Sequence, residues 1–175
     1  QNQYEGKESI KINGTIYNLN WDFSSGIIFQ IENANNNMFI DALITKKGDT
    51  LNIGQIQKVK LAKEGKDAQI LSEVFSREEI MLFKNSLPKN SNPKTYNIDK
   101  PFIQYAVVLD GDGNILNIRF RLCRYPDILN NLKPQRIYEL EKKFKKELKF
   151  IIPHEYREKY KFIPAWYFRV NFDSL

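Results

Sequence analysis

Apolar and polar side chains alternate along residues 102–109 and again along residues 115–123, as in two strands that each bury one face. Between them lies Asp110-Gly111-Asp112-Gly113-Asn114, whose glycines give the backbone the freedom that a hairpin turn needs. Pairing Leu109 with Leu116 collects one apolar surface, made of Ile103, Tyr105, Val107, Leu109, Leu116, Ile118, Phe120 and Leu122. A shift of one residue would turn Gln104 into that surface, so we predict an antiparallel hairpin in the first register.

The apolar spacing then changes to that of a helix. Pro134 suits a first helical turn, where its missing amide donor costs nothing. Apolar residues follow at spacings of three and four and make one stripe, formed by Ile137, Leu140, Phe144, Leu148 and Ile151. The lysines lie away from the stripe, at positions 142, 143, 145, 146 and 149. The pattern predicts a helix over residues 134–151 that packs on the hairpin through Phe144.

Alternation returns near the end of the sequence. Trp166, Phe168, Val170 and Phe172 alternate with Tyr167, Arg169, Asn171 and Asp173. This pattern predicts a half-buried strand whose inner face carries the first set and whose outer face carries the second. Residues 101–175 are therefore predicted to form a strand-turn-strand-helix-strand unit.

Residues 1–88 are predicted to be rich in strands. Asn13-Gly14 between residues 10–12 and 15–17 is a strong hairpin signal, and further strands are predicted over residues 26–32, 37–44 and 55–62. Helical spacing begins after Gly65, and Ser76 with Glu79 has the form of a capping box. The pattern predicts one kinked helical segment over about residues 66–87, followed by a linker over residues 88–100.

These elements predict an α+β fold with an antiparallel sheet. At 175 residues the chain is long enough for one substantial core. Because neither half would bury much surface alone, we predict one domain built from two halves, residues 1–88 and 101–175.

The lack of a long apolar run, the first residue and the cysteine count bear on where the protein is located. No apolar run approaches the roughly 20 residues of a membrane span. The sequence opens on Gln1 with no methionine, and a removed signal peptide or lipoprotein leader would explain that start, as would a trimmed chain. Cys123 is the single cysteine, so no disulfide can form within the chain. We predict an exported protein, in the periplasm or on the cell surface of a Gram-negative bacterium.

The candidate chemical groups favour a protein without enzymatic activity. Asp110, Asp112 and Asn114 have the spacing of a calcium loop, but Ile115 and Arg121 stand where such a loop needs glycine and glutamate. His154 is the only histidine and follows Pro153 at the end of the predicted helix. One histidine and one cysteine do not make a zinc site of the usual kind. We therefore predict no catalytic residue, no metal and no cofactor.

One predicted surface carries a plausible binding site. Arg119, Arg121, Tyr167 and Arg169 project from the sheet face that lies away from Phe144. Arginine beside tyrosine on a sheet binds anions and stacks on the bases of single-stranded nucleic acid. The alternative interpretation is a solvated face, or one covered by the amino-terminal strands.

The carboxy-terminal unit resembles the carboxy-terminal domain of TonB-type proteins. The resemblance is carried by Val107–Asp110, Asp112-Gly113-Asn114-Ile115, and the run from Ile163-Pro164-Ala165-Trp166 to Phe172. The whole chain is also similar to a family of uncharacterised exported proteins of Bacteroides-type bacteria, through Gly54-Gln55-Ile56, the helix that contains Glu79 and the carboxy-terminal unit.

The TonB-like resemblance implies a way of binding a partner. In such an arrangement an exposed strand edge accepts an extended segment of another protein as an additional strand. We therefore predict a binding or protein-interaction module, whose partner is another protein joined by strand addition or a second copy of the chain. The alternative function is a module that binds nucleic acid or another anion through the basic sheet face; between the two, we favour a protein partner over nucleic acid.

Overall fold

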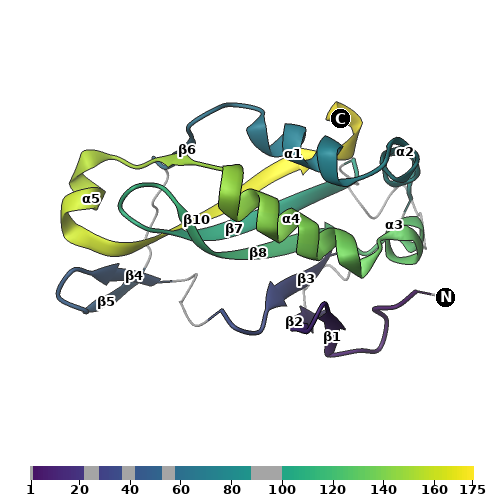
Figure 1. Cartoon of the computed structure of the whole chain (residues 1–175), viewed down its shortest axis with the longest axis horizontal. Coiled ribbons are helices and arrows are strands. Elements are labelled where there is room, and N and C mark those ends of the chain that lie inside the picture. The colour runs from purple at the N-terminus through teal and green to yellow at the C-terminus, as the bar shows by residue number, and fades with distance from the viewer. Residues whose placement is uncertain (1, 22–27, 37–41, 53–57, 88–99) are drawn as a thin grey trace, which may run out of the picture.

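The computed structural model describes residues 2–21, 28–36, 42–52, 58–87 and 100–175. Within these ranges an eight-stranded antiparallel sheet has helices packed on one face (Figure 1). Its strands are β1 (Ser9–Ile12), β2 (Thr15–Asn20), β3 (Ile28–Asn33), β4 (Ala42–Thr45), β5 (Thr50–Asn52), β7 (Phe102–Leu109), β8 (Ile115–Cys123) and β10 (Tyr160–Asn171). Their order across the sheet is β1-β2-β3-β8-β7-β10-β4-β5. The predicted α+β class is confirmed.

The other elements are short helices and one small sheet. The helices are α1 (Lys66–Val74), α2 (Arg77–Lys84), α3 (Pro126–Asn131), α4 (Pro134–Glu147), α5 (His154–Lys159) and the 3-10 turn η1 (Phe172–Ser174). Strands β6 (Lys60–Leu61) and β9 (Phe150–Ile151) pair as a separate two-stranded sheet.

The β7–β8 hairpin has the predicted strand bounds and, over most of its length, the predicted register. Tyr105 lies opposite Phe120, and the pairing continues to Val108. A bulge then pairs Leu109 with Ile115 instead of Leu116. The prediction that Leu116 joins the apolar face is therefore wrong: Ile115 is buried there, and Leu116 is only partly buried.

The turn of this hairpin is held by Asp110. Its carboxylate accepts hydrogen bonds from the backbone N–H of Asp112 and of Asn114, both at 2.9 Å. Gly113 has φ +81° and lies directly against β9, where the N–H of Phe150 donates to the Gly113 carbonyl at 3.1 Å. The turn is thus anchored to the second sheet.

Helix α4 packs on the sheet as predicted but ends earlier. Ile137, Leu140, Phe144 and Leu148 are fully buried, and the Phe144 ring lies 5.0 Å from the Tyr105 ring. The helix stops at Glu147, because Leu148 has an extended backbone and the chain then forms β9. Ile151 pairs with Lys60 there and is 59% exposed, so its predicted place in the buried stripe is wrong.

Strand β10 is longer than predicted and carries a bulge. Ala165 pairs with Val107 and Phe168 with Tyr105, so Trp166 and Tyr167 together face one residue of β7, Ala106. Val170 and Phe172 are buried, and Phe168 stacks on Tyr105 at 5.2 Å, as the alternation predicts. The bulge displaces Trp166, which is 42% exposed instead of lying on the inner face.

Among the described strands, β10 has partners on both sides only near its start, because its residues from Ile163 onward pair with β7 alone. It lies between β7 and β4, and β4 pairs with it at Tyr160 and Phe162. The edges of the sheet, in the ranges that the structure describes, are β1 and β5.

The amino-terminal half follows the predicted pattern in part. Asn13 and Gly14 have positive φ and close the β1–β2 hairpin, and β3 pairs with β8. Residues 26–27, 37–41 and 55–57 of the predicted strands lie outside the described residues, as do residues 88–99 of the predicted linker. Strand β5 is not predicted. Of the strand predicted over residues 55–62, the described residues 58–62 contain the two-residue strand β6.

The predicted kinked helical segment is the pair α1 and α2. The Ser76 hydroxyl accepts from the Glu79 N–H at 3.1 Å, and the Glu79 carboxylate accepts from the Ser76 N–H at 2.9 Å. This capping box is the predicted one.

One buried cluster contains residues from both halves of the chain. Phe75 and Phe83 lie against Phe172, with ring centroids 6.4 and 5.2 Å away. Phe29 and Ile31 of β3 belong to the same cluster as Phe144. The two halves therefore share apolar packing as well as the β3–β8 strand pairing.

Candidate binding surface

The face of the sheet opposite α4 carries cross-strand rows of polar side chains. Because side chains alternate along a strand, residues next to the inward Tyr105 and Phe120 point to this outer face. In one row Gln30 lies opposite Arg121, Arg121 opposite Gln104, and Gln104 opposite Arg169. The next row pairs Glu32 with Arg119 and Arg119 with Ala106. Three of the four residues predicted as a site thus stand in neighbouring rows, and Tyr167 joins them at the bulge.

Arg121 and Tyr167 form the centre of this surface. The Arg121 guanidinium carbon lies 3.9 Å from the centroid of the Tyr167 ring, a stacked cation–π arrangement. Arg121 Nε also donates to Gln30 Oε1 at 3.3 Å. These two contacts hold the planar guanidinium group in a defined orientation on the sheet.

Arg169 makes a second stack of the same kind. Its guanidinium carbon lies 3.8 Å from the centroid of the Phe102 ring. Phe102 is buried on β7, whereas Arg169 is exposed. The outer face therefore presents two guanidinium groups that each lie over an aromatic ring.

Arg119 plays a supporting part in the surface. Its Nε donates to Glu32 Oε2 at 3.1 Å, and both side chains are mostly covered. Burial alone would lower the pKa of Arg119, but Glu32 and the Tyr167 hydroxyl outweigh burial, and the pKa is raised. Arg119 therefore stays charged while Glu32 balances that charge locally.

Trp166 completes the surface, and the sequence pattern did not identify it. Its ring centroid lies 6.1 Å from that of Tyr167. A strict two-residue alternation places Trp166 inward. The one local signal of the bulge that reverses it is Pro164, because proline within strands occurs mainly at edges and bulges. Gln30 and Glu32 were also missed, because they come from a strand about 90 residues away in sequence.

Three other residues considered from the sequence, Cys123, His154 and Asp110, are buried or are bound within their own elements. Cys123 is fully buried, with Sγ 3.4 Å from the Phe102 amide nitrogen. His154 begins α5 and does not end a helix; its exposed ring lies 3.0 Å from Glu158. Asp110 is engaged by its own turn. No group of three or more metal-binding side chains was found among the residues that the structure describes.

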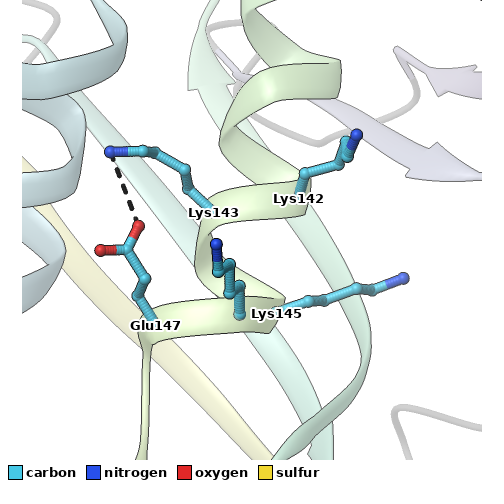
Figure 2. A pocket seen from close by; sticks show the side chains of 5 residues that line it. Lys142, Lys143, Lys145 and Glu147 are labelled. Carbon is cyan, nitrogen blue, oxygen red and sulfur yellow. Dashed lines mark ion pairs between the residues drawn. The ribbon is translucent and has the colours of Figure 1, made fainter.

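A second feature lies on the helical side of the molecule. A shallow hollow of about 530 Å³ on α4 is lined, within the described ranges, by Lys142, Lys143, Lys145, Lys146 and Glu147. Figure 2 shows Lys143 directed toward Glu147, while Lys142 and Lys145 extend to the other side of the helix. In the same described ranges, no helix is long and apolar enough to cross a membrane.

Comparison with known proteins identifies a fold relative but no function. No protein-family model matches the sequence, and no curated protein matches it either. Among solved structures, a DUF5043 family protein from Bacteroides uniformis aligns over 98% of this chain and 88% of that chain, with a TM-score of 0.68. The two sequences are 14% identical, so the likeness shows the fold alone. This chain thus has the fold of a DUF5043 family protein from Bacteroides uniformis.

Proposed function

We propose that the chain is a binding module without enzymatic activity, whose ligand lies on the outer face formed by Arg119, Arg121, Tyr167 and Arg169, with Trp166 beside them. The observation that carries this proposal is the Arg121–Tyr167 stack next to an exposed tryptophan. Exposed arginine and aromatic side chains are the residue types that dominate binding energy at protein interfaces.

A protein segment with acidic side chains is the partner that suits this surface best. A guanidinium fork matches a carboxylate in two parallel hydrogen bonds, and stacking on a ring fixes the plane of the fork in advance. A fixed fork loses less side-chain freedom on binding, so each contact retains more of its free energy. Gln30 and Glu32 accept hydrogen bonds from Arg121 and Arg119 and so hold these two guanidinium groups in place.

Binding can also use the backbone at the sheet edges. We propose that strand addition by a partner protein, or homodimerisation, takes place at β1 or β5, the strands at the two ends of the described sheet order. Size-exclusion chromatography with light scattering, at rising protein concentration, measures whether copies of the chain associate. A mass that stays monomeric at all concentrations would remove homodimerisation from the proposal.

The proposed experiment for the outer face uses an array of synthetic peptides, half of them rich in Asp and Glu and half with those residues changed to Asn and Gln. We expect acidic peptides to be retained, and retention to fall for Arg121→Ala and for Trp166→Ala. The control variant Lys46→Ala with Lys47→Ala removes two exposed charges from the β4–β5 turn and should bind normally. Equal binding of acidic and amide peptides would contradict the proposal.

Nucleic acid is the second candidate, favoured by the same arginine–aromatic stacks, on which bases also stack. Binding of a single-stranded oligonucleotide should then weaken steeply with added salt, because released counterions drive it. Arg119→Ala combined with Arg169→Ala should weaken it further. No mobility shift of single- or double-stranded oligonucleotides at low salt would exclude this candidate.

We also propose that the protein is exported by a Gram-negative bacterium of the Bacteroides type and belongs with the DUF5043 proteins. The shared fold over nearly the whole chain supports this assignment. Cell fractionation after expression of the full-length gene tests it: the protein should be recovered from the periplasm or the cell surface. Recovery from the cytoplasm with an uncleaved start would contradict it.

A further inference from the structure

The outer edge of β1 leaves backbone groups open to a partner. Strand β1 stands at one end of the described sheet order, with β2 as its neighbour there (Figure 1). Along an antiparallel pair, residues that exchange hydrogen bonds with the neighbour alternate with residues whose N–H and C=O point away from it. The Leu19 N–H donates to the Glu8 carbonyl at 2.8 Å, so Ile10, two residues further on, also bonds to β2. Ser9 and Lys11 therefore turn their backbone groups to the open edge.

The open part of this edge is short and symmetric about Ile10. Before it, Lys7 is already engaged: its N–H donates to the Tyr4 carbonyl at 3.1 Å, and its carbonyl accepts from Trp21 Nε1 at 2.9 Å. After it, the chain turns away in the β1–β2 hairpin turn, whose two residues have positive φ. The open donors and acceptors are therefore those of the two residues on either side of Ile10.

This arrangement matches a second copy of itself. A twofold axis perpendicular to the sheet places two identical edges side by side and antiparallel. With Ile10 opposite Ile10 of the second copy, Ser9 lies opposite Lys11 of the second copy, and Lys11 opposite its Ser9. Both of these pairs exchange two N–H···O bonds, so every open group of the edge finds a partner.

Neighbouring registers fit less well. If Lys11 lies opposite Lys11 of the second copy, two like charges face each other directly, which is unfavourable. If Ser9 lies opposite Ser9, Lys11 meets Lys7, whose backbone groups are already bonded. Lysine on an edge strand commonly discourages pairing. In the register centred on Ile10 it faces a serine, so Lys11 selects this register against the others.

The side chains at this edge suit the same register. Ile10 is partly buried and packs on the core, whereas Ser9 and Lys11 are exposed. At a non-hydrogen-bonded position the two Cα atoms lie about 4.5 Å apart, so the two Ile10 side chains meet on the helix side of the sheet. Their contact removes apolar surface from water at the centre of the interface.

We propose that two copies of the chain pair through β1, antiparallel, with Ile10 at the twofold axis. The two eight-stranded sheets then form one continuous sheet. This inference rests on the edge pairing proposed above and narrows it to one edge, one partner and one register. It does not involve Arg121 or Tyr167, so ligand binding on the outer face and pairing through β1 are tested separately.

The first test is disulfide trapping of the whole chain with oxidised glutathione, followed by non-reducing electrophoresis. In Ile10→Cys the two introduced thiols lie within the Cα distances that a disulfide spans. In Glu8→Cys, the matched control on the same side of the strand, they lie about 13 Å apart along the strand direction. We expect a strong dimer band for Ile10→Cys and a loss of that band for Glu8→Cys. The parent carries the buried Cys123 alone and should give no such band.

The second test measures the dimer dissociation constant by sedimentation equilibrium. Ser9→Glu sets a carboxylate opposite Lys11 at two symmetric positions and should tighten the dimer about fivefold. Ser9→Lys sets like charges there and should weaken it by a similar factor. Lys11→Pro removes an edge donor but no bond to β2, and should weaken it at least about tenfold. Lys47→Gln in the β4–β5 turn lowers the net charge as much as Ser9→Glu does and should leave the constant unchanged.

Three outcomes would overturn the proposal. A chain that stays monomeric at its highest soluble concentration removes homodimerisation altogether, while peptide binding to the outer face is decided by its own experiment. A dimer that Lys11→Pro leaves unchanged pairs through another edge or face. A dimer in which Ser9→Glu and Ser9→Lys act alike, or in which Glu8→Cys cross-links as well as Ile10→Cys, has a different register. Melting curves of each variant confirm that it is folded before its association is compared.

Discussion

Buried carboxylates fix two helices to the sheet and one helix to another. The Tyr105 hydroxyl donates to Asp67 of α1 at 2.9 Å, and the Asn33 amide donates to Glu141 of α4 at 2.9 Å. Glu79 of α2 accepts from Arg136 at 3.1 Å. Burial and then the nearby Asp67 charge raise the pKa of Tyr105 far above its ordinary value, so this phenol remains a hydrogen-bond donor. Each contact is costly to break, because it would leave a buried charge without its partner.

Glu79 makes stability depend on pH. Burial raises its pKa, but the hydrogen bonds from Ser76 and Arg136 outweigh burial, and the pKa lies below the ordinary 4.5. A depressed pKa means that the stabilisation is present above pH 4.5 and is lost as pH falls through the folded-state pKa. Glu79→Gln should cost about 1–3 kcal/mol at neutral pH and progressively less in acid.

Urea denaturation in steps from neutral pH downward measures this difference. The neighbouring Glu78 is exposed, and Glu78→Gln serves as the control that should change little at any pH. If the difference in free energy of unfolding between the Glu79 variant and the parent stays constant across the acid range, Glu79 is not the source of the pH dependence.

Gly113 is required by both its conformation and its surroundings. An added Cβ would lie 2.0 Å from the Phe150 carbonyl oxygen, and φ is +81°. Gly113→Ala should therefore lower the free energy of unfolding by more than about 2 kcal/mol. Gly111 lies in the same turn with no atom within 4 Å of such a Cβ. Gly111→Ala should change stability by less than about 0.5 kcal/mol. Equal effects of the two substitutions in chemical denaturation would refute the close contact with β9.

Single residues of the candidate surface were predictable only where alternation held. Arg119, Arg121 and Arg169 share the outer face because each is an odd number of residues from an inward-facing residue along its own strand. The position of Trp166 was not predicted, because the bulge adds one residue to β10 and turns the Trp166 side chain to the other face of the sheet. Partners from β3, such as Glu32, depend on pairing between distant strands, and local periodicity carries no information about that pairing.

At the scale of elements, the end of α4 decides which apolar residues belong to the core. Phe144 is fully buried between Tyr105 and Phe120, and Ile151 lies beyond the helix on β9. Phe144→Ala should lower the free energy of unfolding by about 3–5 kcal/mol. Ile151→Ala removes a side chain that is mostly in solvent and should cost less than about 1 kcal/mol. Thermal and urea denaturation of the two variants compare them directly. Similar costs would support a helix that continues to residue 151.

Long elements were predictable and short ones were not. The β7 and β8 strands and α4 have enough residues to show a clear period. Helix α5 has six residues and buries none of them, so it leaves no apolar stripe to detect. The β6–β9 pair is two residues on each side and forms only because the end of α4 brings Phe150 beside Leu61.

At the scale of the whole molecule, the two tryptophans offer a test of the single-domain prediction. Trp21 lies in the first half, where it stacks on Phe29 at 5.0 Å, and Trp166 lies in the second half. Trp21→Phe and Trp166→Phe leave one fluorescent reporter in each half. If both halves share one core, the two reporters should change at the same denaturant concentration, once each variant is corrected by its circular dichroism transition. Separate midpoints would divide the chain into two domains.

Because β4 pairs with β10, the β4–β5 hairpin can join the sheet only after β10 has been synthesised. Strands β1 to β3 join the sheet through β8, and the β4–β5 hairpin joins it through residues of β10. A nascent chain that has not yet emerged beyond residue 160 therefore has no site on which β4 and β5 can dock. Until then those strands keep unpaired edges, which favour association with other chains. The sheet is completed only after translation of residues 160–171, so the β4–β5 hairpin waits through the synthesis of more than 100 residues before its partner strand exists.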